Sequence, residues 1–131
     1  MVTLANARIV IAAAERKAVE VGQPMNIVVV DTSGNLVAHV RMDGAWIGSV
    51  DISIKKAWIS QILDIATKDL ASDSRSGNQF FRIHASNDSG DTSFAGGIPL
   101  MRGDKVVGAI GVSGGSGEQN HTVAAAGADA F

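Results

Sequence analysis

Residues suited to chemistry gather near the end of the chain, in the segment 106–121 with the sequence VVGAIGVSGGSGEQNH. An apolar, strand-like run ends at Ser113, and Gly114 and Gly115 follow it before a polar, then alanine-rich stretch. Glycines let main-chain N–H groups approach a ligand, and a helix start offers unpaired donors and a positive dipole end. The pattern predicts a site for an anion or a carbonyl group. Alternatively, the glycines only make a tight connection.

Two polar side chains follow the glycine turn, Asn120 and His121. Imidazole titrates near neutrality, and a helix N-terminus favours its neutral form, so His121 is a candidate for moving a proton. The alternative is an exposed helix residue. Asn120 is predicted to contact the ligand together with Ser113, Gly114 and Gly115. Ser113 lacks the G-x-S-x-G elbow of a serine hydrolase, and the turn lacks the G-K-[ST] of a nucleotide-binding loop.

A second candidate group lies in RMDGAW, residues 41–46. Arg41 and Asp43 stand on one strand face, where the guanidinium suits a substrate carboxylate and the Asp43 carboxylate suits orienting a water. A local ion pair or a turn cap would explain the same two residues. His39 shares the face of Arg41 and lines this site if the face is open, or is a packed structural residue if it is not.

Three further residues are candidate ligand contacts. Lys56 lies on a predicted helix and either reaches the ligand or extends to the surface. His84, in the polar stretch 71–95, is a candidate ligand contact or base, although a loop histidine is often neither. Gly97 opens a predicted strand beside the glycine turn. The three histidines show no H-x-x-x-H spacing, so we expect no metal site of zinc type.

Hydrophobic periodicity predicts the elements that must position these residues. We expect a helix from the cap Thr3 to Val21, strands over 26–31 and 36–42, a helix from residue 49 or 51 to about 66, strands over 97–101 and 106–113, and a helix over 119–130. On the first helix the predicted buried stripe is Leu4, Ala7, Ile11, Ala14, Ala18 and Val21. The second has a wide apolar stripe that predicts contact with a sheet and with another helix or chain: Ile52, Ile54, Trp58, Ile59, Ile62, Leu63, Ile65 and Ala66.

Hairpins alternating with helices predict the α+β class, with an antiparallel sheet and flanking helices. No repeat or linker divides the chain, so we expect one domain over residues 1–131. A net charge of −2 with 18% charged residues gives no basic patch for nucleic acid. The absence of cysteine, of an export signal and of a membrane-length apolar segment predicts a cytoplasmic protein with no membrane partner.

Three pieces of sequence carry a resemblance to a known family: VVVDTSGNLVAHVRMDGA at 28–45, KKAW at 55–58, and FAGGIPLMRGDKVVGAIGVSGG at 94–115. In this order they resemble the GlcG and HbpS-like proteins, called haem-degrading or haem-binding and also seen as the C-terminal domain of PduO. The resemblance covers nearly the whole chain. It implies a profilin-like or PAS-like sheet of about five strands, and assembly into dimers, tetramers or larger rings.

The resemblance implies several functions. Some members bind haem, others are associated with glycolate, diol or aromatic-compound catabolism, and some act on small unsaturated dicarboxylates, including by hydrolytic dechlorination. Members usually carry an acidic pair after the glycine turn, where this chain has Gln119, Asn120 and His121. The departure removes a carboxylate from that position and supplies an imidazole.

We therefore expect a homo-oligomeric protein that binds haem or a small carboxylate at the glycine turn. Haem is the cofactor that the resemblance implies, and His84 is then a candidate haem ligand. The residues alone require no cofactor. The alternative is a cofactor-independent hydrolase, dehalogenase or tautomerase for a muconate-type acid, in which Arg41 grips the substrate and His121 or Asp43 handles protons or water. A third reading is a structural subunit of a catabolic complex.

Overall fold

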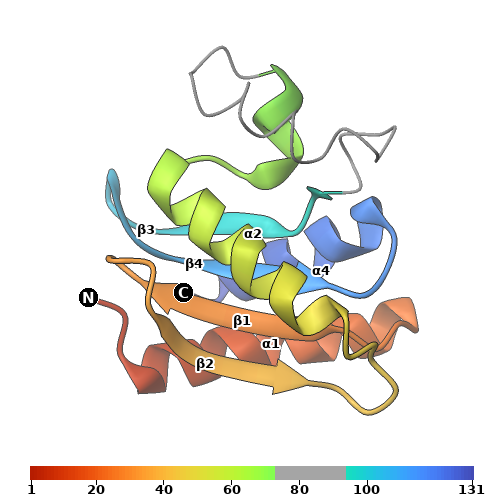
Figure 1. The fold of residues 1–131 in the computed structure, drawn as a ribbon. Coiled ribbons are helices and arrows are strands. Elements are labelled where there is room, and N and C mark those ends of the chain that lie inside the picture. The colour runs from red at the N-terminus through yellow and green to blue at the C-terminus, as the bar shows by residue number, and fades with distance from the viewer. Residues whose placement is uncertain (73–93) are drawn as a thin grey trace.

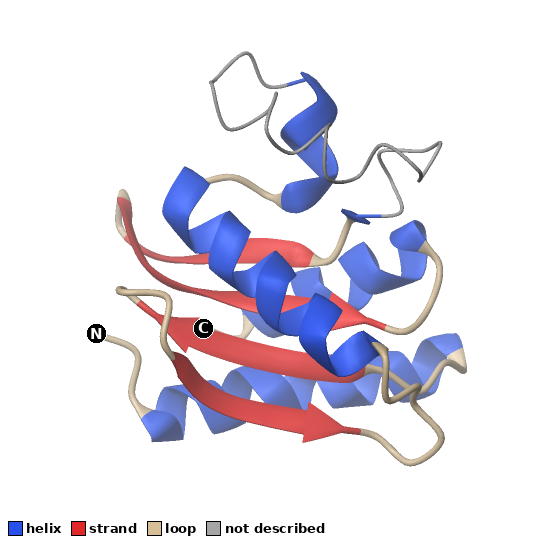
Figure 2. Cartoon of the chain, in the orientation of Figure 1, coloured by secondary structure: helices blue, strands red, loops and turns tan. Residues whose placement is uncertain are grey.

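A four-stranded antiparallel sheet lies between helices in the computed structural model, which describes residues 1–72 and 94–131. Helices α1 (Leu4–Val21) and α4 (Gly117–Asp129) pack together on one face, and α2 (Ser49–Leu63) covers the other (Figures 1 and 2). A short 3-10 helix, η1 (Thr67–Ser72), follows α2. No helix in the described ranges is long and apolar enough to cross a membrane.

The sheet has the order β2-β1-β4-β3, and all neighbours are antiparallel. Its strands are β1 (Asn26–Asp31), β2 (Leu36–Arg41), β3 (Gly97–Arg102) and β4 (Lys105–Ser113). The predicted α+β class is confirmed, with four strands in the described residues where about five were expected. β1 is central, as its apolar character on both faces predicted: Ile27 and Val29 pack toward α1 and α4, and Val28 and Val30 toward α2.

Helix α1 begins and ends where the sequence predicts. Thr3 caps it by accepting a hydrogen bond from the Asn6 N–H, and the Asn6 side chain accepts one from Thr3 in return. Gly22 ends it in the left-handed conformation. The predicted buried stripe is wrong at Leu4, which is 46% exposed, because it lies in the first turn; Val10 is buried instead.

Helix α2 contacts the sheet, as the sequence predicts, but mainly through a face of small and polar residues rather than through the predicted apolar stripe. Its buried residues are small or polar (Ser49, Ser53, Lys56, Ala57 and Ser60), whereas Ile52, Trp58 and Ile62 are 43–46% exposed. Close approach explains the difference: a Cβ on Gly111 of β4 would overlap the carbonyl oxygen of Ser53 and lie 2.7 Å from the Ala57 nitrogen. Small residues therefore line the contact with β4, whereas Ile52, Trp58 and Ile62 lie toward solvent. Of the predicted stripe, Ile54 packs against the core.

The strand directions bring most of the candidate residues to one end of the sheet. β2 and β4 end there, at Arg41 and Ser113, and β1 and β3 begin there, at Asn26 and Gly97 (right side of Figure 1). We call this the Asn26 end. The loop after β2 and the glycine turn before α4 extend from it.

Candidate functional site

Three polar residues form a row across the sheet at the Asn26 end. Asn26 pairs with Arg41 on one side and with Ser113 on the other. Residues opposite each other on neighbouring strands point to the same face, and alternation along β1 puts Asn26 on the same face as Val28 and Val30, beneath α2. Asn26 is fully buried, Ser113 nearly so, and Arg41 is exposed. Arg41 and Ser113 therefore share a face, with Asn26 between them.

Asn26 fixes the orientation of the His39 ring. Its Nδ2 donates to the carbonyl oxygen of Trp46 over 2.9 Å, so its Oδ1 faces His39 Nε2, 3.0 Å away. An amide oxygen can only accept, so the neutral His39 ring carries its proton on Nε2. Burial and then the nearby Arg41 charge lower the pKa of His39, which favours this neutral ring near pH 7.

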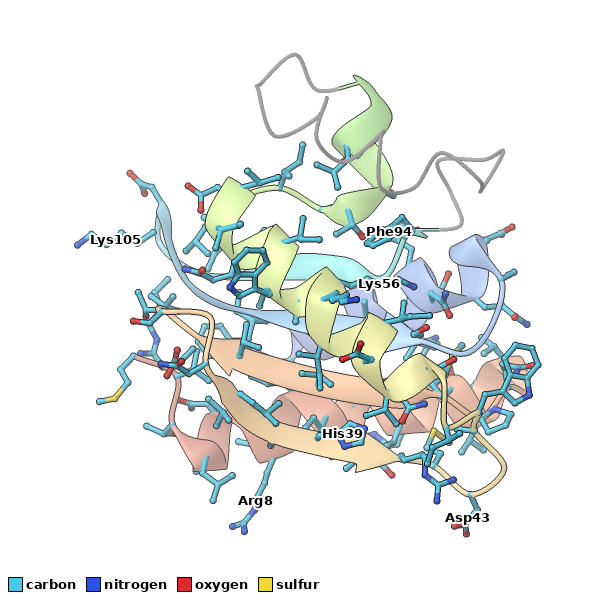
Figure 3. All side chains as sticks on the ribbon, viewed as in Figure 1. Arg8, His39, Asp43, Lys56, Phe94 and Lys105 are labelled. Atoms are coloured by element: carbon cyan, nitrogen blue, oxygen red, sulfur yellow. The ribbon has the colours of Figure 1, made fainter. Side chains whose placement is uncertain are left out.

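The outer strand β2 presents a largely open face on the α2 side, because α2 packs chiefly on β4, β1 and β3. His39 and Arg41 lie on this face, and Asp43 points away from the molecule in the following loop (Figure 3). Arg41 Nη1 donates to the Ala45 carbonyl over 3.3 Å. Among the described residues Arg41 and Asp43 form no ion pair. We call His39, Arg41 and Asp43 the β2 group.

Two main-chain donors of the glycine turn, those of Gly115 and Ser116, are engaged within the chain. The Gly115 N–H donates to Asn120 Oδ1 over 2.9 Å, and Asn120 Nδ2 donates back to the Gly115 carbonyl. Ser116 and Gln119 cap α4 reciprocally. Gly114 has a φ of 132°, which only glycine adopts without strain. Asn120 therefore holds the turn closed, and the Gly115 N–H would have to exchange this bond to reach a ligand.

Lys56 is buried to 1% exposure and is not a surface lysine. Its Nζ donates to the Val112 carbonyl over 3.2 Å and lies 5.8 Å from the centre of the Phe94 ring (Figure 3). Thr67 joins the same region, since its Oγ1 donates to the Phe94 carbonyl and accepts from the Gly97 N–H over 2.9 Å. The Gly97 N–H is thus also engaged within the chain.

Helix α4 begins at Gly117, two residues before the predicted start at residue 119, so His121 is its fifth residue and lies one turn into the helix. The dipole effect fades within the first turn, so it does not govern this ring. Burial, followed by the nearby Lys68 charge, lowers the pKa of His121, and Asp69 opposes the shift. Its Nδ1 is buried and has no hydrogen-bond partner. We call Lys56, Phe94, Asn120 and His121 the β4 corner.

The predicted site residues fall into two groups within one chain. Lys56, Gly97, Gly114, Gly115, Asn120 and His121 lie around the end of β4 and the neighbouring starts of β3 and α4. Arg41 and Asp43 belong to the outer strand β2 and its loop, with β1 between them and β4. Arg41 points to the α2 face, whereas α4 packs on the opposite face. His84 lies outside the described residues.

Sequence reasoning missed three residues of these networks: Asn26, Thr67 and Phe94. Asn26 had a readable signal, because it is a polar residue opening an otherwise apolar central strand. Thr67 and Phe94 meet through contacts between segments 27 residues apart, and no local pattern marks such a pair.

Comparisons with known proteins agree with this architecture. The family model described as haem degrading protein HbpS-like matches residues 2–129. A 15.0 kDa Citrobacter freundii protein from the dhaT–dhaS intergenic region is 36% identical over 130 residues, covering 99% of this chain and 92% of that protein. The crystal structure of Klebsiella pneumoniae protein ORFY is 37% identical, with a TM-score of 0.84 and coverage of 98% and 89%. The crystal structure of a PduOC–haem complex is 28% identical, with a TM-score of 0.80 and coverage of 96% and 91%.

The fold and the similar structures define a small α+β protein. Its antiparallel sheet lies between α1 and α4 on one side and α2 on the other. The chain belongs to the HbpS-like family.

Proposed function

We propose that this protein binds haem at the Asn26 end of its sheet. One observation carries the proposal. At this end, within the described part of the chain, two histidine rings each have a nitrogen with no hydrogen-bond partner, and two cationic side chains form no ion pair with a carboxylate. Haem requires an axial ligand for its iron and positive charge for its propionates. His39 Nδ1 and His121 Nε2 have no hydrogen-bond partner among the described residues, and neither Arg41 nor Lys68 forms an ion pair there. The haem complex of the related PduOC supports the proposal.

The donor set fits the group. An imidazole can ligate haem iron, an ammonium or guanidinium can pair with a propionate, and aromatic and aliphatic side chains can contact the macrocycle. The Asn26 end offers all three kinds, including the exposed apolar residues Trp46 and Ile47, which are 71% and 77% exposed. When bound, haem would supply redox or gas-binding chemistry; the chain itself would hold and orient it.

Titration of the purified protein with haemin tests the proposal. We expect a shifted Soret band that saturates at one haem per chain or per pair of chains at micromolar protein. Serum albumin serves as a positive control for the assay, and heat-unfolded protein as a control for non-specific binding. The absence of a saturable shift relative to the unfolded control would contradict haem binding.

A second candidate function, recognition of a small carboxylate, is favoured by the β2 group. Arg41 is an exposed guanidinium, and the His39 ring beside it presents an Nδ1 that accepts a hydrogen bond. An enzyme for a muconate-type acid would add Asp43 or His121 as the group that moves a proton or orients a water. Turnover of such an acid that survives Arg41→Ala would contradict this role of Arg41.

We also propose that two copies of the chain pair through the outer face of α2. This face carries Trp58 and Ile62, which are one helical turn apart and form a short exposed apolar strip, with the exposed Ile52 toward its edge. Its exposed charges, Asp51 and Lys55, form an i,i+4 ion pair with 3.5 Å between the charged atoms. A two-fold contact is self-complementary, so it can set Asp51 of one copy beside Lys55 of the second. A second copy of the chain is thus the occupant that matches both the apolar strip and its charges.

A further inference from the structure

The two described histidines differ in which ring nitrogen is open. A haem ligand must be a neutral imidazole with an accessible, unpartnered nitrogen. In His121 the buried nitrogen is Nδ1; Nε2 is not buried and has no hydrogen-bond partner among the described residues. Nε2 is the nitrogen farther from the main chain, so a flat macrocycle can approach it without meeting the backbone.

His39 presents the opposite arrangement. Its Nε2 is bonded to Asn26 Oδ1, and Asn26 is fully buried and already donates to the Trp46 carbonyl. Turning the ring to free Nε2 would leave the Asn26 oxygen buried without a partner, which costs about 1–3 kcal/mol. The remaining open nitrogen, Nδ1, adjoins the ring carbon that carries the side chain, where a macrocycle would crowd β2. The structure therefore disfavours His39 as an iron ligand.

One exposed cation and one carboxylate lie near the His121 ring. Lys68 on η1 lies close enough to act on the charge of the ring, and it is exposed and forms no ion pair among the described residues. Asp69 lies on the same short helix and adds a negative charge near the ring. The position of Lys68 allows it to meet a carboxylate of a ligand held at the ring.

We propose that His121 is the axial ligand of haem in this protein, through Nε2, and that Lys68 pairs with a propionate. The inference rests on the proposed haem binding and places the haem at the β4 corner and η1 rather than over the open face of β2. Because no acceptor faces Nδ1, the ring lacks the outer hydrogen bond that ordinarily strengthens a histidine ligand.

The test combines substitution with chemical rescue. Haemin is added to the full chain and to the variants His121→Ala, His39→Ala and His84→Ala, and ligation is read from the Soret position and the electron paramagnetic resonance signal. Millimolar imidazole is then added to each. We expect only His121→Ala to lose the histidine-ligated spectrum, and added imidazole to restore it. His121→Gln, which keeps a polar side chain of similar length, should lose the spectrum as well, with the far-ultraviolet circular dichroism of the parent.

Two results would overturn the inference while leaving haem binding intact. One is a histidine-ligated spectrum that persists in both His121 variants; the other is its loss in His39→Ala or His84→Ala. A parent chain with no saturable Soret shift would instead overturn the proposed function itself. Lys68→Gln tests the second half: we expect weaker haemin binding with an unchanged ligation spectrum, and unchanged affinity would remove Lys68 from the site.

Discussion

At the scale of single residues, the two described histidines are held neutral by different surroundings. His39 is fixed by its bond to Asn26, and burial and the Arg41 charge both lower its pKa. His121 has no partner on its buried nitrogen, and burial and the Lys68 charge lower its pKa. In both rings protonation would place charge in a poorly solvated position beside an existing cation. The neutral form of each ring is thus favoured near pH 7, although only His121 of the two has its Nε2 open.

These lowered pKa values predict the pH dependence of stability. Both folded-state values lie below the ordinary 6.5, so as the pH falls through 6.5 the unfolded chain takes up protons before the folded chain does. The free energy of unfolding should therefore be highest above pH 7 and decrease as the pH falls toward 5.5. Urea denaturation at a series of pH values measures this. The decrease should be smaller in His39→Gln and in His121→Gln; an unchanged slope in both variants would show that these rings do not cause it.

At the scale of the elements, the close contact between α2 and β4 sets the position of Lys56 and with it the β4 corner. Gly111 allows the helix to approach until the Ser53 and Ala57 backbone reaches the strand. Lys56 then lies under the helix, where its Nζ reaches the Val112 carbonyl at the Asn26 end. A side chain at residue 111 would separate the two elements.

We predict that Gly111→Ala is strongly destabilising. The added Cβ would overlap the Ser53 carbonyl and lie 2.7 Å from the Ala57 nitrogen, and neither backbone group can turn aside. Overpacking of this kind costs about 3 kcal/mol when backbone must move. The matched control is Gly48→Ala at the start of α2, where no atom lies within 4 Å of the added methyl group. Thermal unfolding followed by circular dichroism should show a large fall in Tm for the first variant and almost none for the second; equal effects would refute the close-packing account.

Local signals in the sequence were sufficient to predict the helices, the hairpins and their caps. The Thr3 cap, the Gly22 stop and the apolar run of β1 each act within a few residues of chain, and each is confirmed. The orientation of α2 was not predicted, because large apolar residues ordinarily face a core and the restriction to small ones comes from Gly111 on a distant strand. Ser49, Ser53, Ala57 and Ser60 do form a stripe of small residues along α2, and this is the signal that would have indicated the buried side.

At the scale of the whole molecule, the candidate site was predicted only in part, because its residues depend on tertiary contacts. The strand order brings Arg41 and Ser113 to one end and one face, as a pocket shared by these residues requires. It also separates Arg41 from His121, which belongs to a helix on the opposite face. The hydrogen bond between Asn120 and Gly115 could not be predicted either. From the sequence alone, both residues fit equally well as ligand contacts in an open turn.

The outward apolar face of α2 leads to a prediction about assembly. If two copies pair there, Ile62→Lys places a charge in the contact, and the dimer should dissociate to monomers of unchanged fold. Val19→Lys is the matched control, because Val19 is an exposed apolar residue of α1, 71% exposed, on the far side of the sheet from α2. Size-exclusion chromatography with light scattering measures both masses. Since the Asn26 end lies beside the start of α2, a dimer would bring a second copy near the β2 group. A parent chain that runs as a monomer would rule out this arrangement. A dimer that is lost equally in both variants would rule it out as well.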